Sequence, residues 1–128
     1  MSKSLKTAFL IFSMMGLTAG CAGGPAGGPG STLTEEQARG QRLFDQHCES
    51  CHATASEAVI VGPSVQNIGE IADDRVEGLS AEEYLLESIN KPSAYIVEGF
   101  SDQMPATLGQ SLRAEDKEAL IAYLLTLR

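Results

Sequence analysis

The chain has 128 residues, which is enough for one small domain with accessory segments but too short for two separate hydrophobic cores. Its 17 acidic residues outnumber its 9 lysines and arginines, so the formal net charge is −8. An acidic surface of this kind repels nucleic acid and bare anionic membranes, which argues against both as direct ligands and favours a partner with a basic surface.

An export signal is predicted over residues 1–20. Lys3 and Lys6 give a positively charged start, and residues 8–19 form a mostly apolar run. The run is shorter than the roughly 18 to 20 apolar residues that a membrane-spanning helix needs, and no later stretch comes closer. We therefore expect an exported protein, located in the periplasm or at the extracytoplasmic face of a membrane.

The signal ends in Leu17-Thr18-Ala19-Gly20-Cys21, which resembles the lipobox of bacterial lipoproteins. This resemblance implies cleavage before Cys21 and a lipid anchor on that residue. Thr18 stands where an apolar residue is usual, so ordinary cleavage and release of a soluble protein is the alternative. The chain has three cysteines, so one thiol is left without a pairing partner, and a free thiol is a liability in an oxidising compartment. Lipidation of Cys21 would modify this thiol.

Residues 22–31 contain only alanine, glycine, proline and serine. They offer no large apolar side chain to bury, and ordering their glycines would be costly in entropy, so we interpret them as a flexible tether. The predicted organisation is a signal at 1–20, a lipidated cysteine and tether at 21–33, and a folded domain at 34–128.

Three helices are predicted in this domain. Thr34 and Gln37 form a capping-box pattern at the start of a helix that runs to about Gln46. A second start of the same kind at residues 79–83 opens a helix that ends near Asn90, and a third helix with one apolar stripe is predicted over 112–127. Because no alternating run of β-branched residues is present, the predicted fold class is all-α.

Two long irregular stretches, roughly 48–79 and 91–111, separate these helices. Stretches of this length in a small domain indicate a special role. The chain has four phenylalanines, three tyrosines and no tryptophan, which makes a modest apolar interior. We interpret the irregular stretches as segments that wrap a cofactor.

The cofactor is indicated by Cys48-Glu49-Ser50-Cys51-His52. A Cys-x-x-Cys-His motif is typical of covalent attachment of one haem c through both thiols, with the histidine as an axial ligand of the iron. A zinc site would normally need four cysteine or histidine ligands, and too few remain. A redox-active dithiol would follow a strand in a βαβ pattern, which is absent.

Met104 is the predicted second axial ligand. The other methionines, at positions 1, 14 and 15, lie in the signal, so Met104 is the only methionine of the mature chain. It lies next to Pro105 in an irregular stretch, whereas a methionine that fills a core usually lies on a helical stripe. His47 directly precedes Cys48, so we expect it on the same side as His52 and at the surface.

Residues 34–128 resemble a class I cytochrome c. The features that carry the resemblance are Gly40 and Phe44 before the motif, residues 120–124 near the end, Gly62-Pro63, and Met104-Pro105. The resemblance implies three to five helices wrapped around the haem, with the first and last helices crossed. It also implies that the Pro63 carbonyl accepts the Nδ1–H of His52.

Two further points follow from the comparison with this family. Residues 88–105 are also similar to the cytochrome domains fused to subunit II of haem-copper terminal oxidases. The chain lacks the tryptophan with which many relatives bind a haem propionate, so the propionate partners stay open among Tyr84, Tyr95, Asn67 and Arg75.

The predicted function is one-electron transfer without enzymatic activity, because two axial ligands leave no position on the iron for a substrate. Expected partners are an electron donor and an acceptor, for example a terminal oxidase or a quinol-oxidising complex. One alternative is a haem enzyme or gas-binding protein, if Met104 is not a ligand. Another is an anchored cytochrome subunit of a larger respiratory complex.

Overall fold

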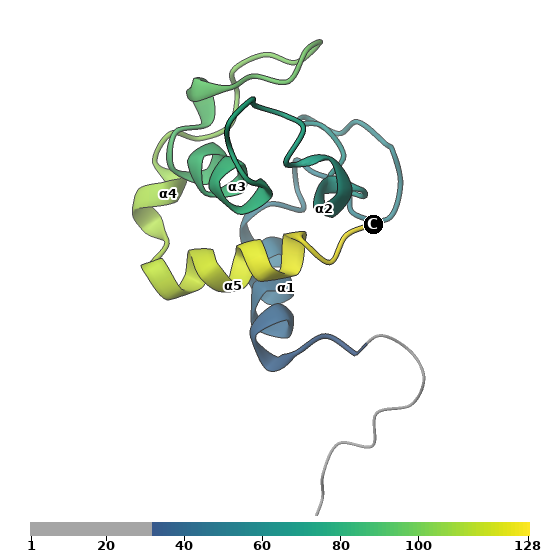
Figure 1. Cartoon of the computed structure of the whole chain (residues 1–128), viewed down its shortest axis with the longest axis vertical. Coiled ribbons are helices and arrows are strands. Elements are labelled where there is room, and N and C mark those ends of the chain that lie inside the picture. The colour runs from purple at the N-terminus through teal and green to yellow at the C-terminus, as the bar shows by residue number, and fades with distance from the viewer. Residues whose placement is uncertain (1–31) are drawn as a thin grey trace, which may run out of the picture. The chain divides into compact units, whose positions relative to one another are not determined.

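The computed structural model describes residues 32–128, and within this range the chain forms helices and no strand. The helices are α1 (Glu35–His47), α2 (Ile68–Ile71), α3 (Ala81–Asn90), the 3-10 helix η1 (Pro92–Ala94), α4 (Leu108–Ser111) and α5 (Ala114–Leu124) (Figure 1). The predicted all-α class is confirmed. None of these helices is long and apolar enough to cross a membrane. The predictions for the export signal, Cys21 and nearly all of the tether lie outside the described residues.

The first and last long helices cross each other, as the resemblance implied (Figure 1). Gly40 of α1 lies directly against the main chain of Ala119 in α5. One turn further along α1, the rings of Phe44 and Tyr123 pack with their centroids 5.8 Å apart. Both aromatic side chains are buried and belong to the core that joins α1, α3 and α5.

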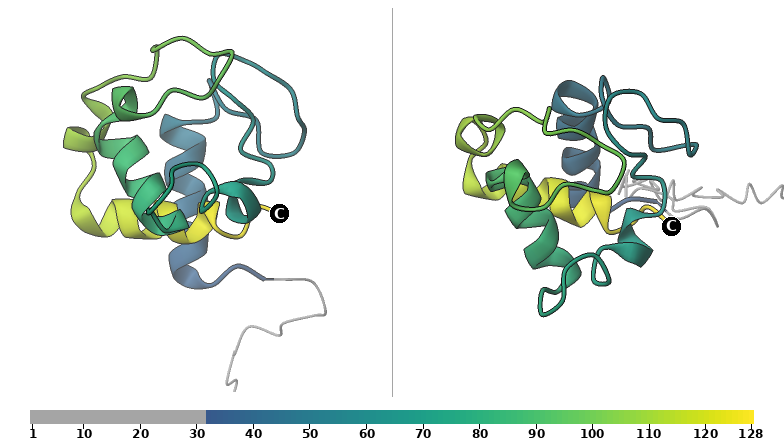
Figure 2. Two further views of the ribbon diagram at one scale, coloured as in Figure 1. Left: turned by 45° about the horizontal axis from the view of Figure 1, so that its top comes forward. Right: turned by 90° about the horizontal axis from the view of Figure 1, so that it is seen from above.

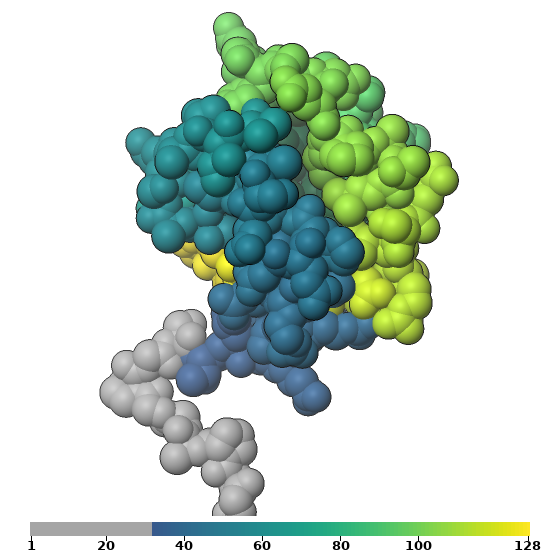
Figure 3. Space-filling model, turned by 180° about the vertical axis from the view of Figure 1, so that it is seen from behind, coloured from purple at the N-terminus to yellow at the C-terminus, as the bar shows by residue number. Residues whose placement is uncertain are grey.

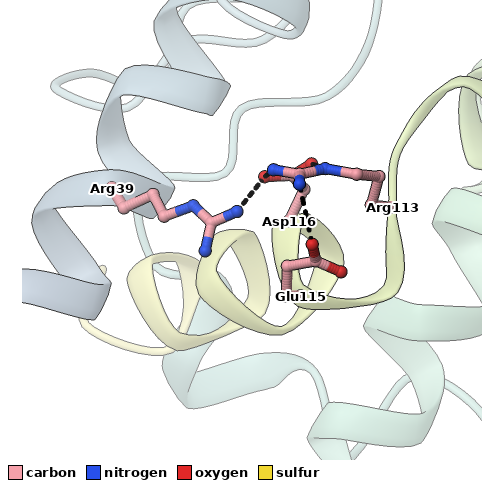
Figure 4. A network of polar contacts seen from close by, with 4 residues as sticks. All are labelled: Arg39, Arg113, Glu115 and Asp116. Carbon is pink, nitrogen blue, oxygen red and sulfur yellow. Dashed lines mark hydrogen bonds and ion pairs between the residues drawn. The ribbon is translucent and has the colours of Figure 1, made fainter.

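A network of ion pairs spans the same crossing (Figure 4). Asp116 near the start of α5 accepts hydrogen bonds from Arg39 of α1 and from Arg113, whose Nε lies 2.9 Å from Oδ2 of Asp116. Arg113 also pairs with Glu115 at 2.9 Å. Asp116 is only 9% exposed, so this carboxylate is partly shielded from water.

Two of the predicted helices begin and end close to where the sequence placed them. Both capping boxes are present: Thr34 and Gln37 exchange hydrogen bonds at the start of α1, and Ser80 and Glu83 do so at the start of α3. α1 ends one residue beyond the predicted Gln46, and α3 ends at Asn90 as predicted.

The third predicted helix, over 112–127, was too long at both ends. Leu112 has an extended backbone (φ −97°, ψ 134°), and α5 starts only at Ala114. At the other end the Thr126 hydroxyl donates to the Tyr123 carbonyl at 2.7 Å, and the carbonyl of Leu127 accepts the N–H of Gly69 at 2.9 Å. The last residues therefore leave the helix and run against α2.

The two stretches predicted to be irregular contain three short helices, namely α2, η1 and α4. None is longer than four residues, so none carries a helical repeat of apolar residues that the sequence could reveal. The rest of both stretches forms loops that connect the helices (Figure 2). These loops form much of the wall of the site described next.

Candidate functional site

A cavity of about 270 Å³ lies between the helices and the two long loops. Its floor is apolar and is formed by buried core side chains, among them Phe44, Leu85, Ile89, Leu120 and Leu124. From behind, Figure 3 shows the hollow between the segment around residue 60 and the segment that leads into α4. The cavity is therefore mostly apolar inside and opens at one surface.

Cys48, Cys51 and His52 all line this cavity. α1 ends just before them, and the Cys48 N–H donates to the Phe44 carbonyl at 2.8 Å. The Cys48 carbonyl then accepts the N–H groups of Cys51 and His52, at 3.0 and 2.9 Å. This tight turn brings the two thiols and the imidazole to one wall. The thiols are free, and burial, with a smaller contribution from Cys51, raises the pKa of the Cys48 thiol to about 11.

The ring of His52 is held by the chain that follows it. Its Nδ1 lies 2.7 Å from the carbonyl oxygen of Pro63. A carbonyl oxygen only accepts, so Nδ1 carries the hydrogen and Nε2 keeps a free electron pair. A Cβ on Gly62 would collide with the His52 ring, so glycine is the residue that leaves room for it. The imidazole is thus prepared to bind a metal through Nε2.

Ser64, which no sequence pattern indicated as important, organises the loop between His52 and Pro63. Its Oγ lies 2.6 Å from the carbonyl oxygen of Ser56 and 3.2 Å from that of Ala53. The Val65 N–H also donates to Ala53, at 2.8 Å. These bonds close the loop directly beside the Pro63 carbonyl.

Met104 lines the same cavity from the segment between η1 and α4. Its side chain is half-buried, and neighbouring cavity residues from this segment include Phe100 and Pro105. The structure therefore brings together His52 and Met104, which lie 52 positions apart in sequence. An imidazole nitrogen and a thioether sulfur together are one of the axial ligand sets that haem iron takes in cytochromes.

His47 is exposed, as expected, although it lies at the edge of the cavity. No group of three or more histidine, cysteine, aspartate or glutamate side chains within residues 32–128 lies close enough together to hold a metal ion.

Arg75 lines the cavity and carries a positive charge. Its Nε is buried and, among the described residues, has no hydrogen-bond partner. A buried guanidinium nitrogen without a partner is costly, which indicates that a ligand supplies the acceptor. Of the four residues considered as propionate partners, Arg75, Tyr84 and Tyr95 line the cavity, whereas Asn67 does not.

Tyr84 and Tyr95 lie beside each other and line the same cavity as Arg75. Their rings pack edge to face with centroids 5.8 Å apart. Burial raises the pKa of the Tyr84 hydroxyl, although Ser88 and the positive charge of Arg75 act in the opposite direction. The phenol is therefore a neutral hydrogen-bonding group at neutral pH.

These features fit a haem. The cavity is apolar enough for a porphyrin, two thiols are spaced for its vinyl groups, and His52 presents a free Nε2. Arg75 offers a buried Nε, which has no partner among the described residues, to a carboxylate. The residues present can therefore hold a haem in three ways. The two thiols can bond to its vinyl groups, His52 can bind its iron, and Arg75 can pair with one of its propionates.

Comparison with known proteins points to the same group. A family model described as Cytochrome c matches residues 37–128. Among solved structures, the chain is similar to an engineered cytochrome c from Rhodothermus marinus, with 18% identity and a TM-score of 0.50 over 77% of this chain and 86% of the other. The same engineered protein bound to a carbene intermediate gives 20% identity and a TM-score of 0.45 over the same shares. No curated protein sequence matches the chain.

Proposed function

Because the chain belongs to the cytochrome c family, we propose that it carries single electrons through a haem c whose iron is bound by His52 and Met104. The haem is attached covalently at the Cys48–Cys51 pair, as in the family as a whole. When bound, it supplies a metal that changes its charge by one unit. The chain provides the ligands and the surroundings that set the reduction potential of the haem iron.

The observation that carries the proposal is the joint placement of His52 and Met104 at one apolar cavity, with Nδ1 of His52 held by the Pro63 carbonyl at 2.7 Å. That hydrogen bond fixes the tautomer and leaves Nε2 free to bind the iron that a haem would bring. The thioether of Met104 would take the remaining axial position. With His52 and Met104 both bound, no site would be left on the iron for a substrate, and the sulfur ligand would favour the reduced state.

The rest of the cavity wall has two tasks. Buried apolar side chains such as Leu85, Leu120 and Leu124 exclude water from the haem, which also favours the less charged, reduced state. Arg75 would pair with a propionate and remove the cost of its own unpaired Nε. Both effects tune the potential without any chemistry at a side chain.

We further propose that the protein works outside the cytoplasm, fixed to a membrane by lipid on Cys21. The support for this is in the sequence: the positive start and apolar run of residues 1–20, the Leu-Thr-Ala-Gly-Cys pattern, and the glycine-rich segment that follows. In this setting a respiratory donor and acceptor, such as a quinol-oxidising complex and a terminal oxidase, are the proposed partners. Mass spectrometry of the native protein tests the haem, the cleavage site and the acylation together.

Carbon monoxide separates the electron carrier from a haem enzyme or gas-binding protein. The reduced wild-type protein is expected not to bind carbon monoxide, whereas Met104→Ala opens the axial position and binds it. A Leu108→Ala variant removes a side chain from the cavity without removing a ligand, so it controls for general loosening of the site and should not bind carbon monoxide. Tight binding by the wild-type protein would contradict the His52 and Met104 ligand pair and support the open-site alternative.

A further inference from the structure

The segment that carries Met104 runs from Lys91, just after α3, to Thr107, just before α4. α3 and α4 contact each other, so the two ends of this Met104 segment meet (Figure 1). Within the described part of the chain, the hydrogen bonds of residues 91–107 join only partners within one turn along the chain, and none ties the segment to a distant part of the fold. Its position therefore depends on apolar packing and on how its ends are joined.

Gly109 of α4 lies against the end of α3. A Cβ on Gly109 would lie 2.6 Å from Cα of Asn90 and 2.7 Å from the carbonyl oxygen of Ile89, which is closer than side chains come to backbone atoms. Both are main-chain atoms, so neither can rotate away. Gly109 is buried and follows Met104 closely in the chain. Glycine is therefore needed here for α4 to lie as near to α3 as it does.

Asn90 links the same place to α5. The Lys117 ammonium donates to Oδ1 of Asn90 at 2.7 Å, and Asn90 is the last residue of α3. We call Gly109, Asn90 and Lys117 the α3–α4 junction. None of the three lines the cavity, so the junction can act on Met104 only through the positions of the helices.

We propose that the α3–α4 junction positions Met104 on the haem iron, with Gly109 as the main positioning residue. The inference rests on the proposed function, in which Met104 is the second axial ligand. While the junction is closed, the Met104 segment is held over the cavity and its thioether can bind. When the junction opens, the segment loses the attachment of one end, and the axial position becomes free.

An added ligand such as imidazole reports on this equilibrium. It competes with Met104 for the same axial position and binds only the molecules in which that position is free. Its apparent affinity is therefore proportional to the open fraction, and a substitution that favours opening makes it bind more tightly.

α2 supplies a matched control for Gly109. Like α4 it has four residues with glycine in second place. A Cβ on Gly69 would lie 2.5 Å from the carbonyl oxygen of Leu125, so alanine at position 69 also forces a contact with main-chain atoms. Gly69 lies outside the Met104 segment and its junction. Gly69→Ala therefore strains the fold without acting on the position of Met104.

The test is a titration of the ferric, haem-loaded proteins with imidazole. Gly109→Ala is expected to bind imidazole about tenfold more tightly than wild type, because opening the junction relieves the backbone contact. The charge-transfer absorption of a sulfur-ligated ferric haem should decrease in parallel. Gly69→Ala should change the affinity by less than about twofold, since it is independent of the junction. Wild-type affinity in Gly109→Ala, or equal gains in both glycine variants, would overturn the proposal.

Two milder variants test the polar part of the junction. Asn90→Ala and Lys117→Ala each remove only the hydrogen bond between these residues, and each should tighten imidazole binding about two- to fivefold. The double variant should gain no more than either single one. Wild-type affinity in both single variants would overturn the role of Asn90 and Lys117. If Gly109→Ala does not fold with haem, these variants decide the whole proposal.

Met104→Ala separates this inference from the proposed function. If Met104 is the ligand, Met104→Ala binds imidazole more tightly than wild type and lacks the sulfur charge-transfer absorption. The junction then stands or falls with Gly109→Ala alone. If wild type already binds imidazole as tightly as Met104→Ala, Met104 is not a ligand, and both the axial pair and the role of the junction are wrong.

Discussion

Gly40 lies so close to the main chain of Ala119 that a Cβ on Gly40 would collide with the Ala119 carbonyl. The contact is between two backbones, so a larger side chain at position 40 has no flexible neighbour to displace. The same crossing brings Phe44 against Tyr123, and both also belong to the core beneath the cavity. The distance between α1 and α5 at this point therefore bears directly on the shape of the site.

Gly40→Ala is expected to destabilise the haem-loaded protein by about 3 kcal/mol, because overpacking against a fixed backbone exceeds the gain in helix propensity. Guanidinium unfolding followed by far-ultraviolet circular dichroism measures the difference. Gln41→Ala, one residue further along α1 on an exposed face, is the matched control and should change stability by less than about 0.5 kcal/mol. An equal effect of both substitutions would show that the close approach is unimportant.

Ser64→Ala is expected to loosen the Pro63 carbonyl, because it removes the hydroxyl that ties Ser64 to the carbonyls of Ala53 and Ser56. The hydrogen on Nδ1 of His52 should then exchange with water faster, and stability should fall by about 1 kcal/mol. Exchange is read from the imidazole N–H signal of the reduced protein. Ser111→Ala removes a similar hydroxyl-to-carbonyl bond, to Leu108, and should leave that signal unchanged.

The parts of this molecule that were predictable from sequence are those encoded by residues close together in the chain. Both capping boxes lie within four residues, and the haem motif lies within five. Met104 was identifiable because no other methionine follows the export signal. Its placement at the same cavity as His52 agrees with that reasoning, although the ligand role itself stays a prediction.

The remaining features depend on contacts between distant residues. Arg39 and Asp116 lie 77 positions apart, and no sequence pattern predicts that they form a pair. Ser64 resembles any loop serine until its carbonyl partners are known. Arg75 was one of four equal candidates for a propionate partner, and only the burial of its Nε distinguishes it. The burial of this atom results from the packing of the whole domain, so a short stretch of sequence does not predict it.

Arg75→Gln is expected to lower the reduction potential by on the order of 50 mV, about 1 kcal/mol, because a positive charge near the haem stabilises the reduced state. Loss of the guanidinium should also raise the pKa of the paired propionate. The potential of the variant would then increase as the pH falls from about 7 to 5, where the wild-type potential stays flat.

Potentiometric titration between about pH 5 and pH 9 checks both effects. Arg42→Gln removes the same charge from an exposed position on α1 and should shift the potential by only a few millivolts. Arg75→Lys retains a cation and should recover part of the potential. A Gln variant with wild-type potential and an unchanged pH profile would place the propionates elsewhere.

Asp116→Asn tests the ion-pair network between α1 and α5. The hydrogen bond from Arg113, together with that from Arg39, holds the pKa of Asp116 below its ordinary value of 3.8. A carboxyl whose folded-state pKa is lowered adds stability that is fully present above the unfolded value and is lost as the pH falls through the folded one. The Asn variant should therefore be less stable than wild type at pH 7.

This difference between wild type and Asp116→Asn should remain constant down to about pH 4 and then narrow, since below that pH both proteins have a neutral side chain at position 116. Thermal unfolding of the haem-loaded proteins across the pH range measures it. Glu118→Gln, at an exposed position outside the network, controls for loss of one negative charge. A double-mutant cycle with Arg39→Gln isolates the link between the helices: if the two substitutions are additive, α1 and α5 are joined by packing, and the ion pair contributes nothing to their crossing.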